Sequence, residues 1–370
     1  MRVFLQLFIV ILLCLIFQFV LFGQTVIAKA EPTPSAERYI LMDETTGRVL
    51  LEKNAHERVS IASITKLMTA VVALQYGNMD DRIKVSEEAL QTSGSSIYLE
   101  KGDELTLEDL LYGLMLRSGN DAAKVIAEHI GGSEEGFVYL MNETAAYIGM
   151  TDSHFMNPHG LDEDNHYSSA HDVAILMQYA MQDDLFREIS STKSYHSKQR
   201  TYPWKNKNKL LTEKYSYTTG GKTGFTNQAG RTLVTTAEKS NMKFITVTLD
   251  APDDWNDHIS LYNWGFDLFS LVQVEKAGIR DFDTDEGIVS GQVPYDVKLL
   301  LRHEEQDFLK NNITLYRQAK DNKLGVMSYY VADEESLLDV PIYQTVSEEQ
   351  TVIEKWQQWL TTLFVVDKDD

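Results

Sequence analysis

The chain has 370 residues, of which 43% are hydrophobic and 24% are charged. A chain of this length and composition can bury a full core and is long enough for roughly two domains, which excludes a disordered or fibrous protein. Its formal net charge of −21 argues against nucleic-acid binding, because such binding needs clustered cations that release counterions from phosphates.

Residues 1–30 have the pattern of a secretion signal. Arg2 precedes an apolar run over residues 3–22, and Ala28-Lys29-Ala30 has the small-x-small pattern of a cleavage site. We expect cleavage after Ala30. The alternative is an uncleaved anchor helix, because the run approaches the ~20 residues that span a bilayer. The only cysteine, Cys14, lies in this segment, so the exported chain would have neither disulfides nor a thiol nucleophile.

Residues 31–271 mix two kinds of hydrophobic pattern. Strand-like runs are bounded by turn residues, and helix-like segments repeat apolar residues every three or four positions. The order of these segments predicts a mixed arrangement of helices and strands rather than strict βαβ repetition. The expected elements are a hairpin at 38–42 and 47–51, helices around 67–74 and 107–114, and strands at 232–234 and 244–248.

The composition changes after residue 271. Short alternating runs dominate residues 272–346, for example 326–331, which follow the turn signal Asp321-Asn322. This pattern predicts a small all-β domain.

Residues 347–370 contain one amphipathic segment. Its apolar residues recur at helical spacing, and ~14 residues at ~1.5 Å rise are too short to cross a bilayer. We expect a helix that lies on a membrane surface; the alternative is a helix packed on the β domain. The apolar residues are Val352, Ile353, Trp356, Trp359, Leu360, Leu363 and Phe364.

Ser63-Ile64-Thr65-Lys66 stands where a loop enters the first long helix. A spacing of three puts the Ser63 hydroxyl and the Lys66 amine on one face, where the amine could take the hydroxyl proton. A serine at this position is also favoured by the helix dipole as negative charge develops on it. Taken alone, the pattern is weak and favours an ordinary helix cap, because many helices begin with Ser-x-x-charged.

Two further motifs follow in order. Ser118-Gly119-Asn120 comes after the second helix, and Lys222-Thr223-Gly224 comes before a strand. Each could be a simple turn. Together with Ser63-x-x-Lys66, they form the ordered set found in the penicillin-recognising serine enzymes, and chance is a poor explanation for all three.

The chain resembles the D-alanyl-D-alanine carboxypeptidase family of low-molecular-mass penicillin-binding proteins over nearly all of its mature length. The segments that carry the resemblance are 61–70, 116–123, 157–161 and 221–226. Residues 204–211 and 219–221 further resemble the sporulation-type members of Gram-positive spore formers. Ile61 stands where many relatives have proline, which does not affect the chemistry.

The resemblance implies an α+β fold, in which a five-stranded antiparallel sheet and a helical cluster enclose the active site. This domain would span residues 31–271, followed by the β-rich domain at 272–346 and the amphipathic helix and tail at 347–370.

The resemblance also implies the roles of the motif residues. Ser63 would attack the carbonyl between two D-alanines, with Lys66 as general base. Ser118 would relay a proton to the leaving amine. The expected substrate-binding residues are Asn120, which orients the substrate amide, Lys222, which supplies positive potential, Thr223, which binds the terminal carboxylate, Gly224, and Phe225, whose N–H joins that of Ser63 in the oxyanion hole.

The implied function is removal of the terminal D-alanine from peptidoglycan pentapeptide stems through a Ser63 acyl-enzyme, with penicillins as inhibitors and no cofactor. The expected location is outside the cytoplasmic membrane, either attached to its outer face or in the cell wall. Besides the stem peptide and β-lactams, the membrane surface is the expected partner.

Four histidines, at 154, 159, 166 and 171, lie close to Asp162, Glu163 and Asp164, which could indicate a metal site. Their spacing fits no known ligand motif, and Pro158 breaks any helical periodicity, so we predict no metal.

Two other functions remain as alternatives. A class A β-lactamase shares the three motifs but needs a glutamate that activates the deacylating water, and residues 157–160 occupy the corresponding span without one. A non-catalytic β-lactam sensor or wall-binding protein on the same fold is the other. The retention of Ser63, Lys66, Ser118 and Lys222 argues against it.

Overall fold

The computed structural model describes residues 30–284, 287–331 and 336–345. Its central feature is a five-stranded antiparallel sheet with the strand order β2-β1-β9-β8-β7. The first two strands form the predicted hairpin, and the last three form a meander whose buried residues are mainly leucine, valine, isoleucine and threonine. The bounds are β1 (Arg38–Asp43), β2 (Val49–Lys53), β7 (Thr218–Thr226), β8 (Gly230–Lys239) and β9 (Met242–Leu249).

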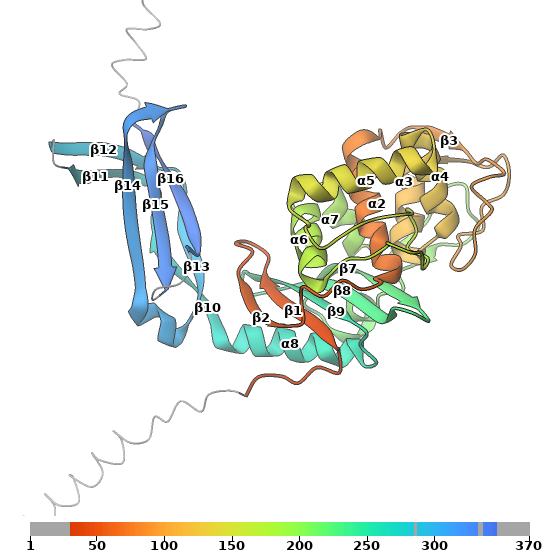
Figure 1. Cartoon of the computed structure of the whole chain (residues 1–370), viewed down its shortest axis with the longest axis horizontal. Helices are drawn as coiled ribbons and strands as arrows, with labels where there is room; N and C mark the ends of the chain where they lie inside the picture. Colours follow the sequence, from red (N-terminus) through yellow and green to blue (C-terminus); the bar gives the residue numbers. More distant parts are fainter. Residues whose placement is uncertain (1–29, 285–286, 332–335, 346–370) are drawn as a thin grey trace, which may run out of the picture. The chain divides into compact units, whose positions relative to one another are not determined.

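Helices cover both faces of this sheet (Figure 1). One face packs on α8 (Asp254–Leu268), and a helical cluster covers the other. Because both faces are covered, β8 is buried along six consecutive residues instead of alternating. The cluster consists of α2 (Lys66–Tyr76), α3 (Leu107–Tyr112), α4 (Asn120–Gly131), α5 (Glu134–Ile148), α6 (Ala170–Ala180) and α7 (Asp184–Ser191).

Helix α2 lies at the centre of the cluster. All of its residues from Lys66 to Ala73 are buried, and Lys66 and Thr69 are the polar side chains among them. The surrounding helices begin at side chains that cap their free N–H groups. These caps are Thr106, Ser133, Ser169 and Asp183.

Short elements join the larger ones. The turn η1 (Ala62–Thr65) leads directly into α2, and η2 (Gly113–Arg117) continues α3 with wider π-type turns up to Ser118. The others are β3 (Arg82–Lys84), β4 (Glu104–Thr106), β5 (Ser194–Tyr195), β6 (Trp204–Lys205), η3 (Leu210–Lys214) and η4 (His303–Phe308).

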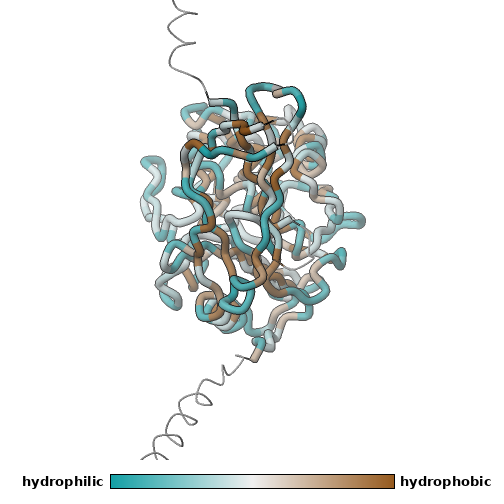
Figure 2. The backbone as a smooth tube through the Cα atoms, turned by 90° about the vertical axis from the view of Figure 1, so that its left-hand side faces the viewer, coloured by the Kyte–Doolittle hydropathy of each residue, from teal (hydrophilic) through white to brown (hydrophobic). Residues whose placement is uncertain are grey.

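The C-terminal region is built almost entirely of strands. A two-stranded sheet joins β10 to β13, and a five-stranded antiparallel sheet has the order β11-β12-β16-β15-β14. Strand β15 alternates buried and partly exposed residues, and hydrophobic stretches run along the strands while the turns are hydrophilic (Figure 2). The bounds are β10 (Phe269–Glu275), β11 (Gly278–Thr284), β12 (Gly287–Val293), β13 (Val297–Arg302), β14 (Leu309–Lys320), β15 (Lys323–Val331) and β16 (Leu338–Gln344).

The structure confirms the predicted α+β class, the hairpin, both helices and the all-β character of the C-terminal region. The boundary after residue 271 falls within β10 and stays a prediction. The expected secretion signal and amphipathic helix lie outside the described residues, apart from Ala30. Within the described ranges, every helix falls short of the length and apolar character that a membrane span requires.

Helix α8 contributes a fully buried histidine to the sheet. The two ring nitrogens of His258 lie 2.7 Å from Thr235 Oγ1 and 3.0 Å from Thr248 Oγ1. Burial lowers the pKa of His258 to about 3, so the folded protein keeps this ring neutral at a pH where an unfolded chain protonates it.

We therefore expect His258 to destabilise the fold as the pH falls below about 6.5, the pKa of an exposed histidine. The unfolded state then binds a proton that the native state does not bind, which removes up to about 1.4 kcal/mol of unfolding free energy per pH unit. Urea unfolding between pH 7 and pH 4.5 should show a flatter pH dependence for His258→Gln than for the wild type. As a control, His196→Gln, at an exposed histidine, should leave the pH dependence of the unfolding free energy as steep as in the wild type. Equal slopes for His258→Gln and the wild type would contradict this account.

Candidate active site

Ser63 lies in η1, one turn before the buried helix α2. Its Oγ is 3.1 Å from Lys66 Nζ, as the spacing of three residues predicts. The preceding residue, Ala62, has a positive φ of 50°, which is uncommon for a residue with a side chain. The unusual conformation of Ala62 begins η1, and η1 places Ser63 just before the start of α2.

The amine of Lys66 is fully buried and contacts three oxygens. Besides Ser63 Oγ, these are Asn120 Oδ1 at 2.7 Å and the carbonyl oxygen of His159 at 2.5 Å. Burial and the charge of Lys222 hold the pKa of Lys66 well below its usual value. A neutral amine has two N–H groups and one lone pair. Asn120 Oδ1 and the His159 carbonyl can only accept, so they take the two N–H groups and leave the lone pair for the Ser63 hydroxyl proton.

Ser118 and Lys222 form a second pair on the other side of the site. Lys222 Nζ donates to Ser118 Oγ at 3.0 Å and to the carbonyl oxygen of Thr223 at 2.7 Å. Burial, followed by the charge of Lys207, lowers the pKa of Lys222 to about 7. Ser118 ends η2 with a positive φ of 63°, a strained conformation that turns its hydroxyl toward Lys222.

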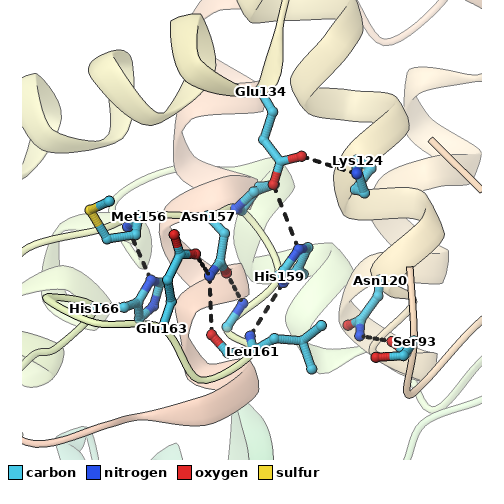
Figure 3. A network of polar contacts seen from close by, with 12 residues as sticks. Ser93, Asn120, Lys124, Glu134, Met156, Asn157, His159, Leu161, Glu163 and His166 are labelled. Carbon is cyan, nitrogen blue, oxygen red and sulfur yellow. Dashed lines mark hydrogen bonds and ion pairs between the residues drawn. The ribbon is translucent and has the colours of Figure 1, made fainter. Parts of the chain in front are cut away.

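Asn120 begins α4 and uses both ends of its amide. Its Oδ1 accepts from Lys66, and its Nδ2 donates to the carbonyl oxygen of Ser93 at 2.5 Å (Figure 3). The next residue, Asp121, is buried and accepts from the backbone N–H groups of Ile97 and Leu99, each at 3.1 Å. The start of α4 therefore fixes the loop around residues 93–99 beside the site.

Strand β7 carries Lys222, Thr223, Gly224 and Phe225 at the outer edge of the sheet. Every second N–H along an edge strand points away from its neighbouring strand and is free to bind a ligand. A Cβ on Gly224 would lie 3.0 Å from the backbone nitrogen of Ser63 and 2.4 Å from Thr232 Oγ1. Glycine at this position therefore lets the strand pass close to the Ser63 N–H.

The turn at residues 157–161, one of the segments that carry the family resemblance, reaches the site with its backbone. Asn157 Oδ1 accepts from the Gly160 N–H at 2.7 Å, and His159 Nδ1 accepts from the Leu161 N–H at 3.2 Å (Figure 3). These contacts hold the His159 carbonyl against Lys66. A backbone carbonyl leaves no residue-type signal in a sequence, which is why the contact was missed.

Asp162 is a second residue that the motifs did not identify. Its Oδ1 accepts from Ser60 Oγ at 2.7 Å and from Thr226 Oγ1 at 2.9 Å. The carboxylate thereby links the segment before Ser63 to the end of β7.

The histidines at 154, 159, 166 and 171 have separate partners. His154 Nδ1 lies 2.8 Å from the Asn165 carbonyl oxygen, and His166 lies 2.8 Å from Thr65 Oγ1 and accepts from the Met156 N–H. His159 Nε2 is 3.6 Å from Glu134, which also contacts Lys124 (Figure 3), whereas His171 lies 3.7 Å from Asp172. These contacts explain the histidines as parts of the scaffold around residues 154–172.

The sequence matches a family model described as D-alanyl-D-alanine carboxypeptidase over residues 25–253. It is 38% identical over 229 residues to the D-alanyl-D-alanine carboxypeptidase DacF of Bacillus subtilis, covering 60% of this chain and 59% of DacF. It is 36% identical to DacC of Escherichia coli, covering 68% of this chain and 67% of DacC. The chain thus spans only about three fifths of the length of DacF.

The structure is similar to crystal structures of penicillin binding protein 5 from Haemophilus influenzae. The TM-score is 0.74 at 30% identity, and the match covers 85% of this chain and 97% of the other.

We expect Lys207 to help keep the Lys66 amine neutral, because its positive charge is one of the causes that lower the pKa of Lys66. Lys207→Gln removes that charge and should raise the pKa of Lys66. The ¹³Cε signal of Lys66, assigned with a Lys66→Arg variant, should then titrate at a higher pH. Lys209→Gln makes the same charge change at an exposed neighbour and serves as the control. A shift to lower pH in Lys207→Gln would contradict the electrostatic cause.

Proposed function

Because the chain belongs to the D-alanyl-D-alanine carboxypeptidase family, we propose that it is a serine-type carboxypeptidase that removes the terminal D-alanine from peptidoglycan pentapeptide stems. The observation that carries this proposal is the Ser63–Lys66 pair. A buried lysine with both N–H groups directed at acceptors has its lone pair free for the serine hydroxyl.

In the acylation step, Ser63 Oγ attacks the carbonyl between the two D-alanines while its proton passes to Lys66 Nζ. The C–N bond of the tetrahedral intermediate then breaks. The departing D-alanine amine takes the hydroxyl proton of Ser118, and Lys222 Nζ, 3.0 Å from Ser118 Oγ, supplies its replacement. The products of this step are free D-alanine and an ester on Ser63, and water hydrolyses the ester afterwards.

The proposed binding roles use the edge strand and α4. Thr223 binds the terminal carboxylate beside the positive Lys222, and Asn120 orients the substrate amide with the N–H group that Ser93 leaves free. The N–H groups of Ser63 and Phe225 stabilise the oxyanion, for which the close approach at Gly224 provides the geometry.

Penicillins would acylate Ser63 by the same route and leave slowly. The Lys66 amine contacts Ser63 Oγ, Asn120 Oδ1 and the His159 carbonyl, none of which is a carboxylate that could activate water. A class A β-lactamase needs such a group for rapid deacylation. The family match favours the peptidase over a β-lactamase and over a non-catalytic sensor.

The place of action is also part of the proposal. Residues 1–30 would direct export, and the amphipathic segment 351–364 would hold the enzyme on the outer face of the cytoplasmic membrane. The likeness of residues 204–211 and 219–221 to sporulation-type members supports a role in maturation of the cell wall, including the spore cortex.

The first test replaces the nucleophile. Ser63→Ala should abolish both D-alanine release from a pentapeptide and covalent labelling by a fluorescent penicillin, because this hydroxyl forms the acyl-enzyme. Ser191→Ala, at an exposed serine on α7, should label normally. Labelling that survives in Ser63→Ala would refute the assignment.

The second test concerns the membrane. Deletion of residues 351–370 from the signal-cleaved protein should release it from sedimenting vesicles while D-alanine release continues. Acidic residues flank the segment, so binding of the full chain should be mainly hydrophobic and change little with salt. The alternative, a helix packed on the β domain, predicts two different results. The full-length protein would not sediment with vesicles, and the truncated protein would lose activity.

A further inference from the structure

A groove of about 600 Å³ is lined by Arg117, the residue before the motif Ser118-Gly119-Asn120 of the site. Three segments line it: the loop around Tyr98, the end of η2, and residues 200–205, which include β6. Its most prominent side chains are Tyr98, Arg117, Arg200, Tyr202 and Lys205.

The groove is positively charged in a strongly acidic protein. Arg200 forms an ion pair with Asp103 at 2.8 Å, whereas Arg117 and Lys205 form none with any residue that the structure describes. The Arg117 guanidinium instead donates to the carbonyl oxygen of Lys205 at 3.2 Å. The net charge of the chain is −21, yet Arg117 and Lys205 have no carboxylate partner at this groove. Their two charges therefore give the groove a positive electrostatic potential.

Lys207 connects the groove to the active site. Its backbone N–H donates to the carbonyl oxygen of Leu116 at 3.1 Å, and its Nζ donates to Ser95 Oγ at 3.1 Å. After burial, the charge of Lys207 contributes to lowering the pKa of Lys66 and Lys222, and the charge of Arg117 contributes to lowering the pKa of Lys207. Lys207 is therefore a positive charge between Arg117 and the two lysines of the site. An anionic group on the substrate would be attracted by these positive charges.

Tyr98 supplies an independent observation. Its backbone has a positive φ of 59°, and its side chain is 82% exposed. A bulky residue in this conformation is strained and persists only when its neighbours are held firmly. Asp121 provides the restraint by accepting from the N–H groups on either side, those of Ile97 and Leu99. Because an exposed ring adds little to the core, the strain points to a ligand that packs on it.

The orientation of the substrate decides which part reaches the groove. The proposed function places the terminal carboxylate at Thr223 and the preceding amide at Asn120. The acyl side of the peptide then continues past Asn120 toward the loop that Asp121 holds. An extended peptide advances ~3.3 Å per residue, so the second residue before the penultimate D-alanine lies roughly 7–10 Å from the attacked carbonyl.

We propose that this groove binds the acyl-side peptide of the substrate and selects a free carboxylate on the second residue before the penultimate D-alanine. Arg117 and Lys205 pair with the carboxylate, and Tyr98 and Tyr202 pack against the aliphatic parts of the peptide. The inference rests on the proposed function and adds to it a preference for an acidic stem.

The test uses two pentapeptides that differ in one group. Both end in the same lysyl-D-alanyl-D-alanine, and the residue before the lysine is γ-linked D-glutamate with its α-carboxylate either free or amidated. The wild type should release D-alanine from the acid with a kcat/KM about threefold to tenfold higher than from the amide, the range expected for partly exposed ion pairs. The advantage should shrink at high salt.

The combined variant Arg117→Gln with Lys205→Gln should bring the acid-to-amide ratio close to one. Lys209→Gln, an equal loss of charge at an exposed lysine outside the groove, should keep the wild-type ratio. Both peptides are measured on the same protein, so a general loss of folding or activity cancels in the ratio.

Three results would overturn the inference. The first is equal rates for acid and amide in the wild type, and the second is a ratio that the combined variant leaves unchanged. The third is a preference for a sugar-bearing stem regardless of the carboxylate, which would assign the groove to glycan. If neither peptide releases D-alanine, the proposed function itself is wrong and the inference falls with it.

Discussion

The burial of a single amine, that of Lys66, is the constraint on which the rest of the site depends. An amine removed from water must either lose its proton or find partners for its charge. Here two acceptor oxygens, Asn120 Oδ1 and the His159 carbonyl, satisfy the N–H groups of the neutral form and direct its lone pair at Ser63. Each acceptor has to be fixed in turn. The start of α4 fixes Asn120 and the Asn157–Gly160 hydrogen bond fixes the turn, so the helical cluster is arranged around one nitrogen atom.

The same site concentrates positive charges that repel one another. After burial, the charges of Lys222 and Lys207 lower the pKa of Lys66, and burial followed by the charge of Lys207 lowers the pKa of Lys222 to about 7. Such repulsion opposes folding, and it persists because it favours function in two ways. It helps to hold the pKa of Lys66, the proposed general base, well below its usual value, and it offers a negatively charged ligand a region of favourable potential. Occupation of the site by a carboxylate would relieve part of the repulsion, which links substrate binding to local stability.

The sequence predicted the parts of the site that depend on side-chain identity and spacing. The Ser63–Lys66 spacing of three, the serine of the second motif and the lysine of the third all lie where the motifs indicate. The contributions of the backbone could not be predicted from the sequence. The position of the His159 carbonyl and the positive φ of Ser118 and Tyr98 are not encoded in a pattern of residue types. Strand order is equally hidden. The pairing of β1 with β9 joins segments about 200 residues apart, and local periodicity contains no information on such contacts.

Close backbone approaches explain why Ser63 and β7 keep a fixed separation. A Cβ on Gly160 would lie 2.0 Å from the Ala62 carbonyl oxygen, and one on Gly224 would lie 3.0 Å from the Ser63 nitrogen. The η1 turn is therefore in contact with the 157–161 turn on one side, where there is no space for a methyl group, and with the edge strand on the other, where a methyl group would fit only tightly against Ser63. Asp162 bridges the same three segments through Ser60 and Thr226. An oxyanion hole needs two N–H donors at a set distance from each other before the reaction begins. In this fold two glycine contacts and one carboxylate hold η1 against β7, and so position the proposed donors, the N–H groups of Ser63 and Phe225.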